Sequence, residues 1–474
     1  MIHVFEASTL YQVASLSSML RSGSIDTHGE RRVLLLVDSA RQPELVPSLR
    51  EAAGFEALAA DFDDVVDFGA ALWPLRPHQF APRRLEQPLF QTLLRAAWGL
   101  GEEDVTLYLE SLQVNPARAL AAVFASSPLV VHADGLMSYG PTRNRLAPEI
   151  LERVRTLVYL DLVPGLSPAL LAEASPRLVA APLEPFARLI DAWAGALAPS
   201  PALQGVIDAA EPTVLVVGQY LSDLGLLTPE HEAEHSRLLL EAALEFGARR
   251  IVFKPHPAAS ASSIGSFHSA ARSAGVQVSF IHDAVPAEVV ASWLAPVGVV
   301  SFFSTTLATL RALGSVPVRA VGTGPLLHAL APFENSNRVP LVLSDALYGD
   351  GADAGLAEDP ARLQALIDSI AYAMRSEQLP ELRSTALRFL AAEPGLRDRY
   401  VKQRRLRALG LPHRSPSSPG RAHRAVHGII KNEEIANKVL SVVRGASDPD
   451  GLRRGSRRAA AAVGSRLVTW SKRA

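Results

Sequence analysis

Short apolar runs alternate with amphipathic stretches along the first 330 residues, a pattern typical of parallel sheets with crossover helices. In the first half, these runs predict strands at Ile2–Glu6, Arg32–Val37, Val105–Leu109, Leu129–His132, Leu157–Leu160 and Leu178–Ala180. Between them, apolar residues recur at helical spacing, as in Phe90–Leu100 and Pro148–Val154. We therefore expect an α/β domain over residues 1–200.

The pattern restarts after Ala198-Pro199-Ser200-Pro201, where proline and small residues predict a linker. A long helix is expected over Glu230–Phe246, among strands at Thr213–Val217, Arg250–Phe253, Val276–Phe280, Gly298–Phe302 and Pro317–Ala320. Two consecutive α/β sets favour a GT-B-like fold, in which two Rossmann-like domains with parallel sheets face a cleft. We expect the second domain to cover residues 207–400, followed by a basic helical tail over residues 401–474.

Composition supports a folded chain and removes several kinds of chemistry. The 474 residues are too many for one ordinary core, and 48% are hydrophobic against 20% charged. The chain has no cysteine, which excludes disulfides, thiolate metal sites and cysteine nucleophiles. The start, Met1–Ala7, indicates a strand rather than a signal peptide, and no window of about 18 uncharged apolar residues predicts a membrane span. These features favour a cytoplasmic protein.

Charge divides the chain into an acidic body and a basic tail. Residues 401–474 hold 17 Lys and Arg against 4 Asp and Glu, whereas the rest holds 30 against 44. Within the tail, a linker rich in proline and serine over Leu411–Gly420 precedes apolar residues at helical spacing. The tail is interpreted either as a solvated extension or as a peripheral contact with an anionic membrane surface. Nucleic-acid binding is not expected, because the body is acidic and carries no recognised module.

Asp134-Gly135 directly follows the expected strand Leu129–His132, and open α/β sheets place ligand sites at such strand ends. A carboxylate there can accept a proton from a hydroxyl as a general base, and Gly135 would let the backbone turn sharply. Asp-Gly is also a common turn dipeptide, so a turn aspartate is the alternative interpretation.

In the second half, Lys254-Pro255-His256-Pro257 ends another expected strand. The two prolines restrict the backbone and present His256 rigidly. This pairing suits an anionic leaving group, because Lys254 supplies charge and His256 can donate a hydrogen bond or a proton. A loop histidine bound to a nearby carbonyl is the alternative.

Two further segments follow strands of the second half. Ser304-Thr305-Thr306 precedes a helical stretch that ends at Gly314, which predicts Ser304 as the N-cap and the amides of Thr305 and Thr306 as an anion site. Helix capping alone would explain one of the three hydroxyls. Gly218-Gln219 follows Thr213–Val217 and is expected to face the cleft between the domains.

The order of these motifs resembles the bacterial α-2,8-polysialyltransferase family of sialyltransferases. The acidic-Gly motif stands here as Asp134-Gly135, the His-Pro motif as His256-Pro257 and the Ser/Thr motif as Ser304-Thr305-Thr306. The similarity covers about residues 1–390 and includes Ala7–Gln12, Gly218-Gln219-Tyr220 and Val285–Glu288.

The resemblance implies an inverting transfer of sialic acid from CMP-sialic acid to an oligosaccharide or glycolipid, in capsule or surface polysaccharide biosynthesis, with no cofactor and no metal. Residues 1–200 would hold the acceptor and residues 207–400 the nucleotide sugar. Asp134 would be the base, and His256 would protonate or stabilise the leaving CMP phosphate. The donor site would comprise Gly218, Gln219, Lys254, Pro257, Ser304, Thr305 and Thr306.

One departure from the family stands at Ala133, where a further acid is usual, so catalysis would depend on Asp134. Three alternatives remain open. A CDP-glycerol-type polyol-phosphate transferase also pairs a His-Pro loop with a serine-rich loop, but needs no base at position 134. A transferase of Kdo or another nonulosonate would differ in its sugar pocket. A catalytically degenerate glycan-binding homologue would bind CMP without turnover, and Ala133 is its best support. A second pair, Asp350-Gly351, is interpreted as solvent-facing.

Overall fold

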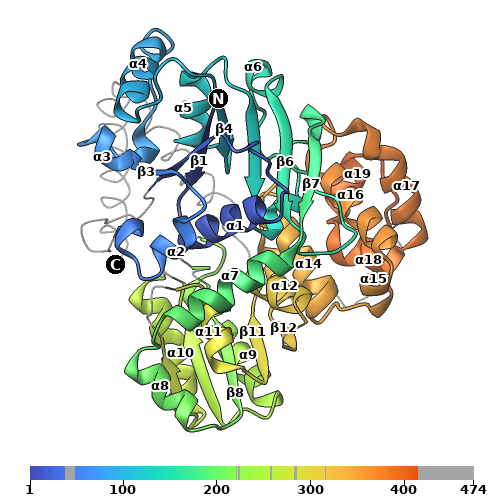
Figure 1. The fold of residues 1–474 in the computed structure, drawn as a ribbon. Helices are drawn as coiled ribbons and strands as arrows, with labels where there is room; N and C mark the ends of the chain where they lie inside the picture. Colours follow the sequence, from blue (N-terminus) through green and yellow to red (C-terminus); the bar gives the residue numbers. More distant parts are fainter. Residues whose placement is uncertain are drawn as a thin grey trace, which may run out of the picture. The chain divides into compact units, whose positions relative to one another are not determined.

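The computed structural model describes residues 1–37, 48–219, 221–222, 225–256, 259–281, 285–314 and 316–414. Residues Met1–His413 form one compact unit that contains two parallel sheets (Figure 1). Pro257 and the tail beyond Arg414 lie outside the described residues, so what the sequence predicts for them stays a prediction.

The first sheet has the order β3-β2-β1-β4-β5-β6-β7, with all neighbours parallel. Its central strands are buried along their whole length, as expected where helices cover both faces of a parallel sheet. The order reverses between β1 and β4, the kind of position at which such sheets bind ligands beyond their strand ends. The strands are β1 (Ile2–Ala7), β2 (Arg31–Leu36), β3 (Asp64–Asp67), β4 (Val105–Leu109), β5 (Leu129–Ala133), β6 (Val154–Leu160) and β7 (Arg177–Ala181).

Helices accompany this sheet and then lead to the second. The first of them, α1, is capped by Thr9, whose Oγ1 accepts a hydrogen bond from the backbone amide of Gln12 at 3.1 Å. The last of them, α7, packs against α1 of the first half and α11 (Ala287–Leu294) of the second. The Trp293 side chain of α11 donates a hydrogen bond to the Ala194 carbonyl of α7 at 2.8 Å. The helices are α1 (Leu10–Arg21), η2 (Leu49–Glu51), α2 (Phe55–Ala59), α3 (Phe68–Leu72), η3 (Pro77–Gln79), α4 (Gln87–Ala97), α5 (Ala117–Val123), η4 (Leu136–Tyr139), α6 (Pro148–Leu151), η5 (Ala172–Ala174) and α7 (Leu183–Ala196).

The second sheet has the order β10-β9-β8-β11-β12, again parallel throughout, and reverses between β8 and β11. Its strands are β8 (Thr213–Val217), β9 (Arg250–Lys254), β10 (Val278–Phe280), β11 (Gly298–Ser301) and β12 (Val318–Ala320). Its helices are α8 (Pro201–Asp208), α9 (Pro229–Glu245), α10 (Ala261–Ser273), α11 (Ala287–Leu294), α12 (Thr305–Ala312), α13 (Thr323–Ala329) and α14 (Arg338–Tyr348).

The chain then returns to the first half through a final set of helices. In Figure 1 these orange elements stand beside β7, and the Ser167 amide donates to Gln364 Oε1 of α16 at 2.7 Å. They are α15 (Ala354–Glu358), α16 (Pro360–Arg375), η6 (Pro380–Leu382), α17 (Arg383–Ala392), α18 (Pro394–Tyr400) and α19 (Gln403–Ala408).

The predicted fold class, α/β with two parallel sheets, is confirmed, and each expected strand is present within a few residues. Two local predictions need correction. The strand β3 was not predicted, because two of its four residues are aspartates. The helix expected over Pro148–Val154 ends at Leu151, since Val154 already begins β6.

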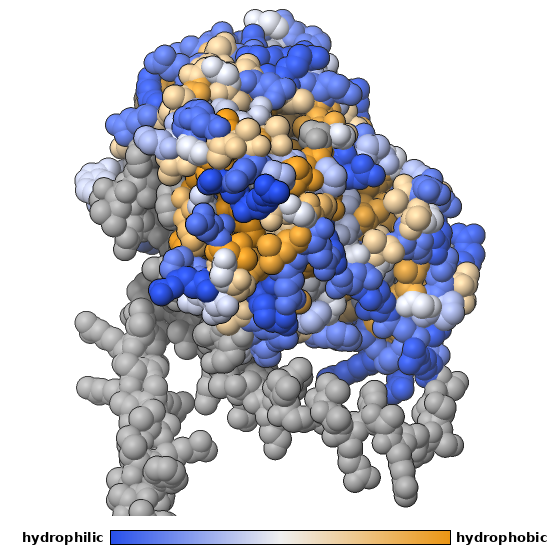
Figure 2. Space-filling view, turned by 90° about the horizontal axis from the view of Figure 1, so that it is seen from below, coloured by the Kyte–Doolittle hydropathy of each residue, from blue (hydrophilic) through white to orange (hydrophobic). Residues whose placement is uncertain are grey.

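Hydrophobic side chains gather in the centre of the face seen in Figure 2, with hydrophilic ones around them. Much of any folded surface is apolar, so this alone assigns no function. None of the helices in the described part of the chain combines the length and the apolar composition that crossing a bilayer requires.

Candidate active site

Three carboxylates lie at the carboxyl ends of the adjacent strands β1, β4 and β5, where the order of the first sheet reverses. Glu6 lies near the end of β1, Glu110 follows β4, and Asp134 follows β5. The Glu110 amide donates to Glu6 Oε2 at 3.4 Å. The carboxyl ends of parallel strands meet at one edge, so the topology concentrates negative charge there.

Burial raises the pKa of the acids at this edge. It raises the pKa of Asp134 to about 7, with further contributions from the negative charges of Glu110 and Glu288. Burial, followed by repulsion from Glu110, raises the pKa of Glu6 to about 8. Burial also raises the pKa of Glu110, although a hydrogen bond with the Gln12 side chain partly opposes this effect. A carboxyl group whose pKa lies near neutrality is suited to accepting a proton at neutral pH.

Neighbouring polar side chains hold this edge in place. Gln12 Oε1 accepts hydrogen bonds from the Ser8 amide at 2.7 Å and the Ser8 hydroxyl at 2.9 Å. His132 Nε2 lies 2.9 Å from the Glu6 carbonyl oxygen, and burial lowers the pKa of His132 to about 4. The imidazole is therefore neutral at pH 7 and donates from Nε2, whereas its buried Nδ1 has no partner among the described residues.

Lys254 and His256 lie at the end of β9 in the second half. Lys254 is 7% exposed, and His256 is half-buried two residues further on. Burial, followed by the positive charge of Lys254, lowers the pKa of His256 to about 4. The imidazole is therefore neutral at pH 7 in the unliganded chain.

Gly218 and Gln219 lie at the reversal point of the second sheet. The Gly218 amide donates to the Lys254 carbonyl at 2.8 Å, and Gln219 Oε1 accepts from the Phe303 amide at 3.0 Å. A Cβ at Gly218 would lie 2.6 Å from the ring of Phe253, so the space there suits only glycine. These contacts bring the predicted donor residues Gly218, Gln219 and Lys254 to one end of the sheet, beside Phe303, which directly precedes Ser304.

Ser304 caps α12 as predicted, and its Oγ accepts from the Thr306 amide at 3.3 Å. Because the Thr306 amide is engaged by this cap, the expectation that it is free for an anion is wrong. The Ser304 cap leaves the Thr305 and Thr306 side chains at the first turn of the helix, next to the first half of the molecule.

The two halves meet at Gly135. A Cβ built on Gly135 would lie 3.3 Å from Thr305 Oγ1, and Tyr11 Oη lies 3.3 Å from Thr309 Oγ1. The chain bends at Gly135 as expected, but its φ of −136° is one that any residue can adopt, so the bend does not itself require glycine. The small size of Gly135 is what matters, since it lets β5 approach α12 closely.

Glu288, the second residue of α11, was not among the predicted site residues. It is 4% exposed, and burial raises its pKa, against a hydrogen bond with the Thr306 side chain and the attraction of Lys254. Its negative charge also contributes to the raised pKa of Asp134. The charge of Glu288 therefore interacts both with Asp134, the base predicted in the first half, and with Lys254, the cation of the second half. The available sequence signal was its place in the family-like segment Val285–Glu288.

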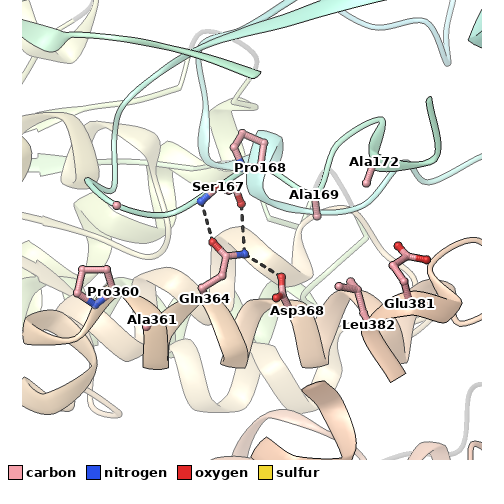
Figure 3. Close-up of a pocket in the computed structure, with 11 residues that line it drawn as sticks. Ser167, Pro168, Ala169, Ala172, Pro360, Ala361, Gln364, Asp368, Glu381 and Leu382 are labelled. Atoms are coloured by element: carbon pink, nitrogen blue, oxygen red, sulfur yellow. Dashed lines mark hydrogen bonds between the residues drawn. The ribbon is translucent and has the colours of Figure 1, made fainter. Parts of the chain in front are cut away.

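A depression lies elsewhere, between residues 165–172 and α16 (Figure 3). It has a volume of about 600 Å³, and Gln364 spans it with hydrogen bonds to Ser167 and Asp368. Asp368 and Glu381 line it, so it would repel an anionic nucleotide. None of the predicted site residues lines this depression, and the described part of the chain has no group of three or more His, Asp and Glu arranged to share a metal ion.

Residues 3–322 match the family model described as alpha-2,8-polysialyltransferase (POLYST). This chain belongs to that family. The match contains the acidic-Gly, His-Pro and Ser/Thr motifs and confirms the family predicted from them. The polysialyltransferase-family chain is thus a glycosyltransferase of the sialyl-transfer type, acting on a nucleotide-sugar donor and a glycan acceptor.

Solved structures resemble the chain at low identity. The GT-B domain of a sialyltransferase from Photobacterium damselae is 12% identical with a TM-score of 0.40, covering 74% of this chain and 98% of that one. MurG from Acinetobacter baumannii is 11% identical with a TM-score of 0.35, covering 81% and 93%. Anabaena Alr3699/HepE in complex with UDP is 12% identical with a TM-score of 0.38, covering 84% and 95%. All three TM-scores lie below 0.5, so the family rests on the sequence model. No curated protein matched the sequence significantly.

Proposed function

We propose that this chain transfers sialic acid from CMP-sialic acid to a hydroxyl of an oligosaccharide or glycolipid, with inversion and without a metal ion. One observation carries the proposal: Gly135, next to Asp134 in the first half, lies so near α12 that a Cβ on it would be 3.3 Å from Thr305 Oγ1 of the second. A base and a leaving-group site on opposite sides of one reacting carbon are what an inverting displacement needs.

Asp134 would take the proton from the acceptor hydroxyl as the sugar is transferred. Its raised pKa supports this role, because a carboxylate with a pKa near 7 removes a proton more effectively than an ordinary aspartate. The Ala133 departure does not remove the base. Ala133 is the last residue of β5 and pairs with Tyr159 of β6, whereas Asp134 follows the strand in the loop where the proposed base is needed.

His256 and Lys254 would act on the departing CMP. A phosphate placed beside His256 adds negative charge and raises the pKa of its imidazole, opposing the effects of burial and Lys254. His256 would then donate a hydrogen bond or a proton to the leaving phosphate. Gly218, Gln219, Ser304 and Thr305 would hold the nucleotide alongside it.

Glu288 would position this machinery rather than react. Its interactions with Thr306 and Lys254 join the start of α12 to the end of β9. Keeping Lys254 oriented before the donor arrives reduces the cost of ordering the site on binding.

The proposal also covers where the enzyme acts and what else it contacts. We propose a cytoplasmic enzyme of surface polysaccharide synthesis that needs no cofactor and contacts the inner face of the membrane through residues 401–474. The excess of basic residues in this tail supports that contact.

Product analysis tests the reaction. Purified chain is incubated with EDTA, an oligosialic acceptor and, in parallel, CMP-sialic acid, CMP-Kdo or CDP-glycerol. We expect product only with CMP-sialic acid, with the anomeric configuration inverted by NMR. Retained configuration, loss of activity in EDTA, or transfer from CDP-glycerol would each contradict the proposal. Binding of CMP without any product would instead favour a degenerate homologue.

A further inference from the structure

Large apolar side chains are strongly exposed on α4 and in the turns beside α3 and α4 in the first half. Leu89 and Leu93 lie one turn apart on α4 and are 59% and 51% exposed, and Leu85, in the turn just before this helix, is 95% exposed. Trp73 and Leu75, just after α3, are 71% and 47% exposed. Figure 1 shows α3 and α4 next to each other, at the β3 edge of the sheet. We call these five residues the α3–α4 apolar surface.

These side chains are not needed for the local core, which is already filled from the other face. Phe68, Phe80, Phe90 and Trp98 pack edge to face beneath them, with ring centroids 5.2 to 5.6 Å apart. Leu94, on the inner face of α4, is 3% exposed. A helix that is apolar on its outer face as well as its inner face indicates a second apolar environment.

The same segment is basic, in contrast to the acidic body around it. Residues 68–100 hold four arginines and one glutamate. Arg84 is exposed, and the Arg76 guanidinium lies 5.7 Å from the centroid of the Trp73 ring. Two of the aspartates that precede this segment are paired elsewhere, Asp61 with Arg21 and Asp64 with Arg31.

We propose that the α3–α4 apolar surface docks this chain on an anionic phospholipid bilayer. Trp73 and the leucines would enter the interface between headgroups and acyl chains, while Arg76 and Arg84 contact lipid phosphates. Charge selects this occupant. The chain's own basic tail would meet like charge here, and a second copy would place the same arginines against themselves in a two-fold contact. The residues of this surface are different from those of the tail and from those proposed for transfer.

The absence of cysteine from the sequence allows a direct test on the full chain. Leu89→Cys carries an environment-sensitive fluorophore, and Leu244→Cys, at a 40% exposed leucine of α9, is the matched control. Vesicles contain phosphatidylcholine alone or with phosphatidylglycerol. We expect the label at position 89 to shift to the blue with anionic vesicles only, and the label at position 244 to stay unchanged.

Co-sedimentation adds a second measurement. Leu85→Ser/Leu89→Ser/Leu93→Ser should bind anionic vesicles about tenfold more weakly than the parent, whereas Leu244→Ser should match it. Circular dichroism checks that both variants fold.

Three outcomes would overturn the docking proposal. Equal sedimentation of the parent and the triple variant, with no spectral shift of the label at position 89, would assign binding to the tail. A concentration-dependent shift without vesicles assigns the surface to a second copy. Absence of vesicle binding rejects a membrane altogether. Neither donor nor acceptor enters these measurements, so their result is independent of the transferase proposal.

Discussion

At the residue scale, the account depends on an acidic edge whose protonation the fold controls. Glu6, Glu110 and Asp134 end three neighbouring strands, and Glu288 approaches from the second half. Each charge makes the next harder to create, so the pKa of Asp134 depends on its neighbours as well as on burial. The function of a single aspartate can therefore be tuned by residues that never touch substrate.

The pH dependence of the reaction should report Asp134. Because its pKa is raised to about 7, the carboxylate form needed to accept a proton is lost as the pH falls below that value. We expect kcat/KM to decline on the acid side with an apparent pKa near 7. Replacing Glu110 with glutamine removes a negative neighbour and should move this decline to lower pH.

Steady-state rates from about pH 5 to pH 9 measure this effect. Glu102→Gln, at an exposed position, serves as the control and should leave the profile in place. A profile that Glu110→Gln does not move would show that another group controls the acid limb.

Glu6 should make stability depend on pH in the opposite way from an ordinary salt-bridged acid. Its folded pKa of about 8 lies above the ordinary value of 4.5, so the native state holds the proton more tightly between these values. The free energy of unfolding therefore falls as the pH rises from about 4.5 to about 8. Glu6→Gln keeps an acceptor for the Glu110 amide but cannot ionise.

Urea unfolding at both ends of this range gives the comparison. The difference in free energy of unfolding between Glu6→Gln and the parent should grow in favour of Glu6→Gln by on the order of 1 kcal/mol or more from the acid to the alkaline end of the range. Parallel stability curves for the two proteins would contradict the assignment of a raised pKa to Glu6.

At the element scale, the alternation of apolar runs predicted most of the fold. Central strands such as β4 and β8 are buried at every position because both faces are covered, and their largely apolar sequences predict this. The edge strand β3 is half aspartate and leaves no such signal. The Ser304 cap could be predicted, since it is local; the engagement of Glu288 with Thr306 could not, because it joins two helices through tertiary packing.

Gly218 offers a test of how tightly the elements of the second sheet are packed. A methyl group there would overlap the Phe253 ring, which stacks on Phe267 with centroids 4.2 Å apart. Gly218→Ala should cost about 1–3 kcal/mol of stability and weaken CMP binding, since β8 and β9 must separate. Adding Phe253→Leu should restore part of both losses.

Gly205 provides the matched control. It lies in α8 with open space around its Cα, so Gly205→Ala should stabilise the chain by about 0.5–1 kcal/mol. Calorimetry with CMP and thermal unfolding measure both variants. Equal behaviour of the two alanine variants would show that Gly218 is not constrained by Phe253.

At the scale of the whole molecule, a buried carboxylate fastens the C-terminal helices to the second half. The Asp345 side chain is fully buried and accepts from Arg399 Nη2 at 2.7 Å, Tyr400 Oη at 2.8 Å and Thr323 Oγ1 at 2.5 Å. Burial opposes ionisation, but hydrogen bonds, led by that of Arg399, hold the pKa of Asp345 below its ordinary value. This cluster keeps α18 against α14.

Removing one partner should therefore loosen the C-terminal helices. Arg399→Met leaves the Asp345 charge buried without its cation and should cost about 2–3 kcal/mol, less than a fully buried pair because Arg399 is partly exposed. Arg404→Met, at an exposed position of α19, is the control and should change little. Thermal unfolding gives the comparison, and equal melting temperatures for the two variants would contradict the role given to Asp345.

The proposed reaction requires a base and a leaving-group site on opposite sides of one carbon. The first half supplies the base and the second half the leaving-group site. The measurement that tests this most directly is CMP release from CMP-sialic acid with an oligosialic acceptor, comparing the parent chain with Asp134→Asn. Asp350→Asn, at the exposed Asp-Gly pair, is the matched control. We predict acceptor-dependent release by the parent and by Asp350→Asn, and a loss of about 100-fold or more in Asp134→Asn with CMP binding retained. Release that survives in Asp134→Asn would contradict the account.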